Sequence, residues 1–145
     1  MENSESLIRK ARALESAGQD EGALGCYLQA LTGVEQPDAN LLARAGVLQL
    51  RLGRVEEAAE TLARASDLYA GAGLRNNALA LCHRVLRVAP ERPDFLRRMG
   101  ELSATQGYRN DARRGYLELA SRLDADAAAA ALRDYLRHFP TDPAV

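Results

Sequence analysis

The chain has 145 residues, the length of one domain, and its 47% hydrophobic and 27% charged residues are typical of a globular protein. It contains 5 tyrosines, 2 phenylalanines and no tryptophan, which argues against a β-sandwich and against a stacking surface for single-stranded nucleic acid. The formal net charge of −1 gives no overall field that would attract DNA or a membrane. Alanine and leucine together supply 50 of the 145 residues, which favours helix.

The charge is unevenly distributed along the chain. Residues 1–74 carry 7 basic and 11 acidic side chains, a net −4, whereas residues 75–145 carry 12 and 9, a net +3. All basic residues except Lys10 are arginine. This usage is typical of a GC-rich genome, so we expect a bacterial source.

Apolar residues that recur every three or four positions predict about eight antiparallel helices. In chain order they are expected at about 4–17, 20–34, 39–52, 55–71, 75–88, 93–106, 109–123 and 126–138. Prolines mark several boundaries, because proline cannot continue a helix but suits its first turn. Pro37, Pro90 and Pro140 follow predicted helices, and Pro93 opens one.

Four glycines stand shortly before predicted helices, and each is followed five residues later by an alanine. They are Gly18, Gly53, Gly73 and Gly107. Glycine readily adopts the left-handed conformation that ends a helix, and an alanine one turn into the next helix lets two backbones approach closely. The pattern predicts tight helix–turn–helix hairpins copied along the chain, and such solenoids usually bind other molecules rather than catalyse reactions.

Three of these hairpins can be aligned position by position. A small residue precedes the turn glycine by seven, an alanine follows it by five, and two further positions follow after four and three more residues. The positions are filled by Ala11, Gly18, Ala23, Tyr27 and Ala30; by Gly46, Gly53, Ala58, Leu62 and Ala65; and by Gly100, Gly107, Ala112, Tyr116 and Leu119. These spacings place the residues on one face of each helix, so small side chains are predicted to meet large ones across each hairpin.

In these positions the chain resembles the tetratricopeptide repeat (TPR) family. The family signature has a small residue in the first helix, a glycine before the turn, and alanine, aromatic and alanine positions in the second helix. The family's opening tryptophan is replaced here by Leu7, Leu42 and Leu96. The resemblance implies an all-α, right-handed helical-hairpin solenoid that serves as a non-catalytic protein–protein interaction module.

The repeat spacing is irregular. Gly18 and Gly53 are 35 residues apart, whereas Gly53 and Gly73 are only 20 apart, which leaves room for one helix. The helix at 55–71 is therefore expected to belong to two hairpins, and the helix at 109–123 is expected to do the same.

We predict a single TPR-like repeat domain over residues 1–145, with units at about 4–36, 38–90 and 91–140. Pro143 stands where Pro93 opens a helix in the preceding unit, so we expect the chain to be a fragment of a longer protein. The alternative, that the two P-x-x-P stretches are ligands for a proline-binding groove, is less favoured because helix boundaries explain them.

No catalytic motif is recognisable, whether G-x-S-x-G, a glycine-rich phosphate loop or H-E-x-x-H. Cys26 and Cys82 lack C-x-x-C partners and are expected to be small buried hydrophobic residues, although the sequence leaves a disulfide between them open. His83 and His138 lack further ligands at metal-binding spacing, which predicts surface histidines. We expect no enzyme activity, catalytic residue, metal or cofactor.

Neither a signal peptide nor an apolar run of ~20 residues is present, which favours a cytoplasmic location and no membrane partner.

The candidate site is the concave groove that the resemblance implies, lined by the first helix of each hairpin. The alignment places Glu5, Ile8, Arg12 and Glu15 there from the first helix; Asn40, Ala43, Val47, Leu50 and Arg51 from the third; and Asp94, Arg97, Arg98 and Glu101 from the sixth. The strip is apolar in its middle and basic at its C-terminal end. This suits a partner helix or extended peptide that carries acidic residues.

Other interpretations stay open at this point. Val47 and Leu50 could pack in the core while the charges are solvated. A lysine and asparagine clamp, with which some TPR proteins hold a carboxyl terminus, is not matched, since Ile8, Arg12 and Arg44 stand nearest.

The main alternative function is self-association as an assembly scaffold. A ligand-sensing domain or enzyme is less favoured, as is nucleic-acid binding by a basic strip, because acidic residues interrupt the strip and stacking aromatics are missing. The strip comprises Arg84, Arg87, Arg92, Arg97 and Arg98, with Arg109, Arg113 and Arg114 near the next turn.

Overall fold

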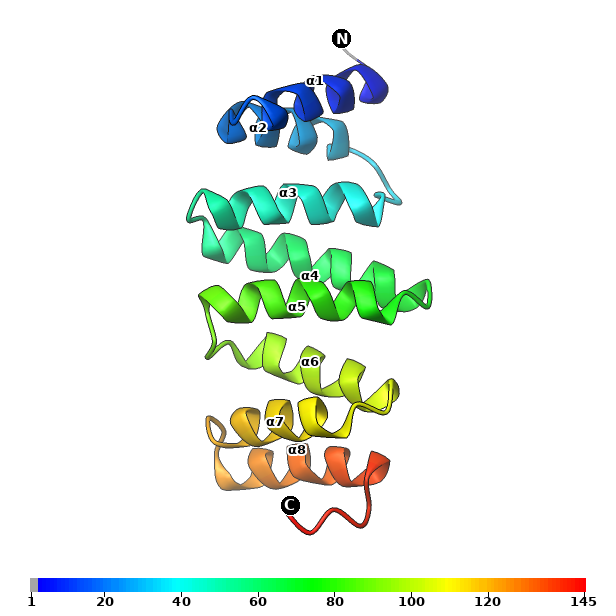
Figure 1. Cartoon of the computed structure of the whole chain (residues 1–145), viewed down its shortest axis with the longest axis vertical. Coiled ribbons are helices and arrows are strands. Elements are labelled where there is room, and N and C mark those ends of the chain that lie inside the picture. Colours follow the sequence, from blue (N-terminus) through cyan, green and yellow to red (C-terminus); the bar gives the residue numbers. More distant parts are fainter. Residues whose placement is uncertain (1–2) are drawn as a thin grey trace. The chain divides into compact units, whose positions relative to one another are not determined.

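The computed structural model describes residues 3–145, and within that range the chain forms eight α-helices and no β-strand (Figure 1). The helices are α1 (Ser4–Ser16), α2 (Asp20–Leu31), α3 (Ala39–Arg51), α4 (Val55–Gly71), α5 (Arg75–Val88), α6 (Pro93–Thr105), α7 (Arg109–Ala120) and α8 (Ala125–His138). The predicted all-α class with helical hairpins is confirmed. The chain divides into two compact units, Met1–Tyr69 (unit 1) and Ala70–Val145 (unit 2), with the boundary near the end of α4.

Short polar side chains begin three of the helices. Asn3 accepts a hydrogen bond from the Ser6 N–H, Asp38 accepts from the first turn of α3, and Asp124 accepts from the Ala127 N–H. Each satisfies backbone donors that have no partner within the helix. Pro93 lies in the first turn of α6, as predicted.

Two helices end three residues earlier than the sequence predicted. The second helix was expected to reach residue 34, but α2 ends at Leu31 because Gly33 adopts a left-handed φ of 75°. The seventh was expected to reach residue 123, but α7 ends at Ala120. There the Leu123 N–H donates to the Ala120 carbonyl in a short turn, after which Asp124 begins α8.

The four predicted glycine corners are confirmed. Gly18, Gly53, Gly73 and Gly107 have φ values of 76°, 77°, 80° and 79°, a region that other residues enter at a cost. After α1, the Gly18 N–H donates to the Glu15 carbonyl and the next N–H donates to the Leu14 carbonyl. The same pair of bonds follows α3 and α6, so one Schellman turn closes all three aligned hairpins.

The paired helices approach closely where the sequence places small residues opposite large ones. A Cβ atom added to Gly46 would lie under 3.0 Å from two side-chain carbons of Leu62, and one added to Gly100 would lie 3.0 Å from the Tyr116 ring. A Cβ added to Gly115 would lie 3.2 Å from the Gly100 backbone nitrogen. Leu62 and Tyr116 are buried, so they have little room to move away. The predicted small-to-large packing is therefore confirmed.

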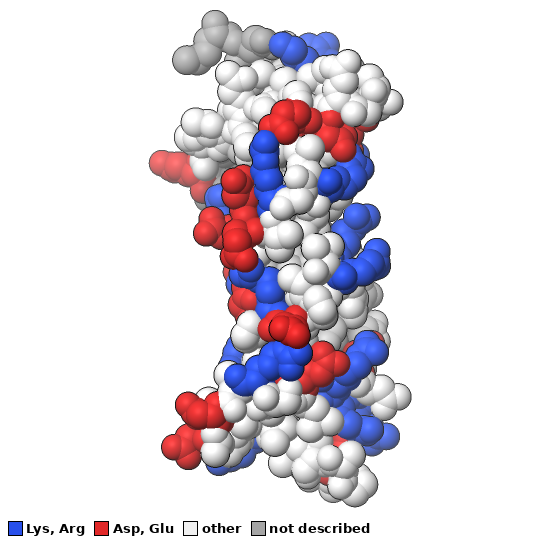
Figure 2. Space-filling model, turned by 90° about the vertical axis from the view of Figure 1, so that its left-hand side faces the viewer, with Lys and Arg blue, Asp and Glu red and all other residues white. Residues whose placement is uncertain are grey.

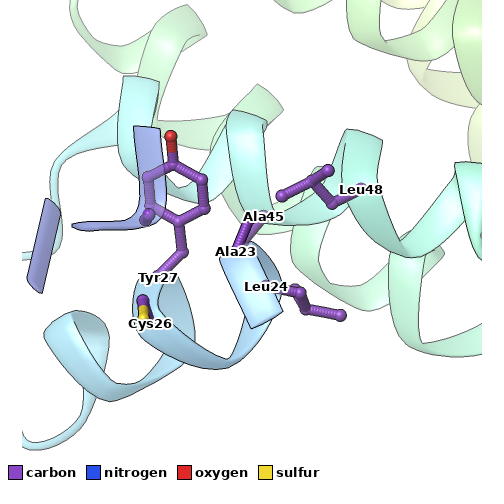
Figure 3. Close-up of a cluster of buried hydrophobic side chains, with 7 residues drawn as sticks. Ala23, Leu24, Cys26, Tyr27, Ala45 and Leu48 are labelled. Atoms are coloured by element: carbon purple, nitrogen blue, oxygen red, sulfur yellow. The ribbon is translucent and has the colours of Figure 1, made fainter. Parts of the chain in front are cut away.

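The core of unit 1 joins α1, α2 and α3. Ala23, Leu24 and Tyr27 of α2 meet Ala45 and Leu48 of α3 in this cluster (Figure 3). Cys26 belongs to the same cluster. Both Cys26 and Cys82 are buried, as their positions on apolar helix faces predicted, and they are not joined by a disulfide.

In unit 2, α7 packs against both α6 and α8, as the predicted sharing of this helix requires. The Tyr135 ring of α8 lies 5.9 Å from that of Tyr116 and 5.2 Å from that of Phe139. Tyr135 also fixes the segment after α8, because its hydroxyl donates to the buried carboxylate of Asp142. The same carboxylate accepts from Arg113 Nε at 2.8 Å and from the Ala144 N–H at 2.9 Å.

These hydrogen bonds stabilise the ionised carboxylate. The bond from Tyr135 contributes most, followed by the Ala144 N–H, and together with Arg113 they lower the pKa of Asp142 to about 2 despite burial. The carboxylate therefore stays charged at neutral pH and holds residues 139–145 against α7 and α8.

We predict that Gly46→Ala destabilises the chain, whereas Gly25→Ala stabilises it. Alanine gains ~1 kcal/mol over glycine in a helix interior, but at Gly46 the overpacking against Leu62 costs about 1–3 kcal/mol. Nothing lies within 4 Å of a Cβ added at Gly25, so that variant keeps the gain. Urea unfolding of the two variants measures the difference. Equal gains in both would show that α3 and α4 are not tightly packed at Gly46.

We predict that Asp142→Asn lowers the Tm at neutral pH and that its deficit shrinks in acid. The folded-state pKa lies below that of the unfolded chain, so the ionised group stabilises the fold above about pH 4. This contribution is lost as the pH falls toward 2. The measurement is Tm against pH for the wild type and Asp142→Asn, with the exposed Asp126→Asn as control. A deficit that stays constant from pH 7 to pH 2 would contradict the assignment.

Candidate functional site

A surface cavity of about 360 Å³ lies between α1 and α3 in unit 1. It is lined by Arg12, Glu15 and Ser16 of α1 and by Arg44 and Arg51 of α3. We call it the α1–α3 groove. Its lining residues are one or two turns apart on each helix, so they share a face. The groove is a polar surface with three guanidinium groups.

Glu15 organises the charges in this groove. Its Oε1 accepts a hydrogen bond from the Tyr27 hydroxyl at 3.0 Å and lies 3.4 Å from Arg44 Nη1. Its Oε2 lies 3.6 Å from Arg51 Nη2, and Arg51 also pairs with Asp20 at 3.1 Å. The carboxylate thus holds arginines at two turns of α3.

Tyr27 links this charge network to the core. Its ring is buried against α3, and burial raises the pKa of its hydroxyl, with the hydrogen bond to Glu15 adding to the shift. The hydroxyl therefore stays protonated and donates to Glu15, which fixes the direction of the carboxylate. Residue 27 is thus both a core residue and a positioning residue for the groove.

The groove carries more positive than negative charge. Arg12 is exposed and has no ion-pair partner within residues 3–145. Arg44 and Arg51 share the carboxylate of Glu15, and their side chains remain about half exposed. Such exposed pairs are weak, so these arginines can turn to an anionic ligand at little cost.

The structure brings part of the predicted unit 1 set together. Arg12, Glu15 and Arg51 line the groove, whereas Glu5 lies exposed in the first turn of α1 and Ile8 is half-buried. The predicted apolar residues are half-buried rather than fully in the core. They are Ala43, Val47 and Leu50 of α3.

The side chain of Asn40 forms a hydrogen bond within unit 1, in which its Oδ1 accepts from the Tyr69 hydroxyl. Arg44, which the sequence offered only as part of an unmatched clamp, is a lining residue that the prediction missed. It lies seven residues before Arg51, a spacing that places both on one face of α3.

The predicted residues of α6 belong to unit 2. Asp94 pairs with Arg92 at 3.3 Å, and the Arg98 guanidinium lies 5.5 Å from the centre of the Phe95 ring. Arg97 is half-buried and Glu101 is exposed. Their role in binding a partner remains a prediction.

Three arginines of the basic strip form ion pairs with carboxylates of unit 2. Arg92 pairs with Asp94, Arg113 with Asp142 and Arg114 with Asp111. Figure 2 shows one face of the chain on which basic and acidic side chains lie next to one another. Nucleic-acid backbones attract a surface with a continuous excess of basic groups, so this arrangement does not favour them.

His83 is half-buried and His138 exposed. Among the described residues, His, Cys, Asp and Glu side chains form no cluster of three that could hold a metal ion. None of the helices within residues 3–145 has the length and apolar character that a membrane span requires.

No protein-family model and no curated protein matches the chain. Similar solved structures include a tetratricopeptide repeat protein from Parabacteroides merdae, with 18% identity, a TM-score of 0.42 and coverage of 96% of this chain and 68% of that one. A thermophilic TPR protein of Thermus thermophilus shows 23% identity, a TM-score of 0.39 and coverage of 96% and 93%. PilF of Pseudomonas aeruginosa shows 17% identity, a TM-score of 0.40 and coverage of 97% and 78%. With identities below 25% and TM-scores below 0.5, these structures say nothing of the role of this chain.

Proposed function

We propose that the chain is a protein-interaction module and that its α1–α3 groove binds an acidic, partly apolar peptide segment. The observation that carries the proposal is that three arginines from two helices line one groove, in which Glu15 pairs with two of them. Arginine is well suited to this role, because its planar guanidinium donates paired hydrogen bonds to a carboxylate.

The exposure of the arginines supports recognition. Arg44 and Arg51 are paired only weakly with Glu15, so each can exchange that contact for a carboxylate of the ligand. Arg12 remains exposed to meet a ligand first. Charges of this kind also raise the association rate and set the register of a peptide.

The apolar part of the ligand would bind to the neighbouring face of α3. Ala43 and Val47 lie one turn apart and alternate along the helix with Arg44 and Arg51. Both are half-buried, so each still presents apolar surface. A segment in which acidic and apolar residues alternate would match this face of α3.

We predict that a random-peptide display library selected on the chain yields sequences rich in Asp and Glu next to apolar residues. The double variant Arg12→Ala/Arg44→Ala should weaken binding of these peptides at least about tenfold, which corresponds to about 1.4 kcal/mol. Its Tm should stay close to that of the wild type, because exposed ion pairs contribute little to stability. Fluorescence anisotropy measures the affinities.

The matched control is Arg109→Ala/Arg133→Ala, which removes two exposed arginines outside the groove. It should leave the affinities unchanged. If the selected peptides carry no acidic bias, or if the two double variants weaken binding equally, the proposed use of the α1–α3 groove is wrong.

A further inference from the structure

Unit 2 contains a second cavity, of about 260 Å³, where α5, α6 and α7 meet. It is lined by His83, Leu86, Arg87 and Pro90 at the end of α5, by Leu96 and Met99 of α6, and by Arg114 and Glu118 of α7. We call it the α5–α7 groove. None of these residues belongs to the predicted concave strip.

The groove has an apolar floor and a basic rim. Leu96 and Met99 are buried at its base, and Leu86 is half-buried beside them. Arg87 and Arg114 are exposed on opposite sides. The floor can adapt to different side chains, because the unbranched methionine has three rotatable bonds.

The charges of the rim come from two helices at matching spacing. Arg87 follows His83 by four residues on α5, and Glu118 follows Arg114 by four on α7. Residues four apart lie above one another on a helix, so each pair forms a row along its own helix. The pair of Arg114 with Asp111 is about half exposed on both sides and holds the arginine only weakly.

This surface is distinct from the one that the sequence predicted on α6. Leu96 and Met99 point into the α5–α7 groove, whereas Arg97 and Glu101 lie on the other side of the same helix by its 3.6-residue period. A ligand in this groove would leave the predicted α6 residues uncovered. The groove also lies in a different compact unit from the α1–α3 groove.

We propose that the α5–α7 groove is a second protein-binding site, which takes an acidic peptide segment with one apolar anchor residue. The cavity is smaller than the roughly 300–1,000 Å³ of typical small-molecule pockets, so it fits an anchor side chain rather than a whole ligand. The anchor enters over Met99 and Leu96, and flanking carboxylates meet Arg87 and Arg114. Unit 2 carries a net charge of +3, which favours an acidic partner.

The groove suits a peptide better than a nucleic-acid backbone. Glu118 stands within the rim and has no ion-pair partner among residues 3–145, so it repels a continuous row of phosphates. Among the described residues no Tyr, Phe or Trp lines the groove to stack on a base. A peptide can avoid Glu118 or donate a backbone N–H to it.

The test measures the binding of peptides selected from a random display library to two kinds of rim variant. One kind removes positive charge and the other removes negative charge. Arg87→Ala/Arg114→Ala should weaken a class of acidic peptides at least about tenfold, a class that Arg12→Ala/Arg44→Ala leaves unchanged. Glu118→Gln should tighten the same class, because it removes a carboxylate from the rim. A variant that merely unfolds cannot tighten binding, so the two directions separate recognition from stability.

The control variant Arg109→Ala/Arg133→Ala should leave the binding of both classes of peptide unchanged, and the Tm of each variant reports its folding. Absence of a class sensitive to Arg87→Ala/Arg114→Ala overturns the proposal while leaving the α1–α3 groove untouched. A short DNA duplex that displaces the peptides, with loss of its own binding in Arg87→Ala/Arg114→Ala, would overturn it in favour of a phosphate backbone.

Discussion

The close approach of paired helices is the constraint on which the rest of the structure depends. Gly46 and Gly100 have no side chains, so Leu62 and Tyr116 can fill the space between the helices. A short helix gains little stability alone and depends on packing of this kind. The left-handed glycine after each first helix then returns the chain at the right distance to make that contact.

The same packing places the candidate binding groups. Tyr27 fills the large position of the first hairpin, and its hydroxyl extends from the core to Glu15 in the α1–α3 groove. Met99 lies next to Gly100 in α6 and lines the α5–α7 groove, and a Cβ added to Gly115 of α7 would lie 3.1 Å from its Cε. Each groove is therefore built directly on a hairpin core, and its charged side chains stand on rigid helices rather than loops.

The hairpins were predictable because their signals are local. A glycine with positive φ and an alanine five residues later mark a corner within one stretch of sequence. The left-handed turn at Gly33 was not predicted, because no alanine follows this glycine at that spacing. Arg12 and Arg51 were predicted through alignment of the repeats, but the contact of Arg44 with Glu15 joins residues 29 apart and has no local signature. Likewise, nothing in the pattern around Asp142 signals that it pairs with Arg113 of α7.

The most direct test of this account is native-state hydrogen exchange on Leu62→Ala. The substitution empties the space opposite Gly46 and should cost about 2–5 kcal/mol. If α3 and α4 are stable only as a packed pair, amide protection should fall by a similar free energy in both helices. Loss of protection confined to α4, with α3 unchanged, would contradict the claim that the small-to-large contact holds the hairpin together.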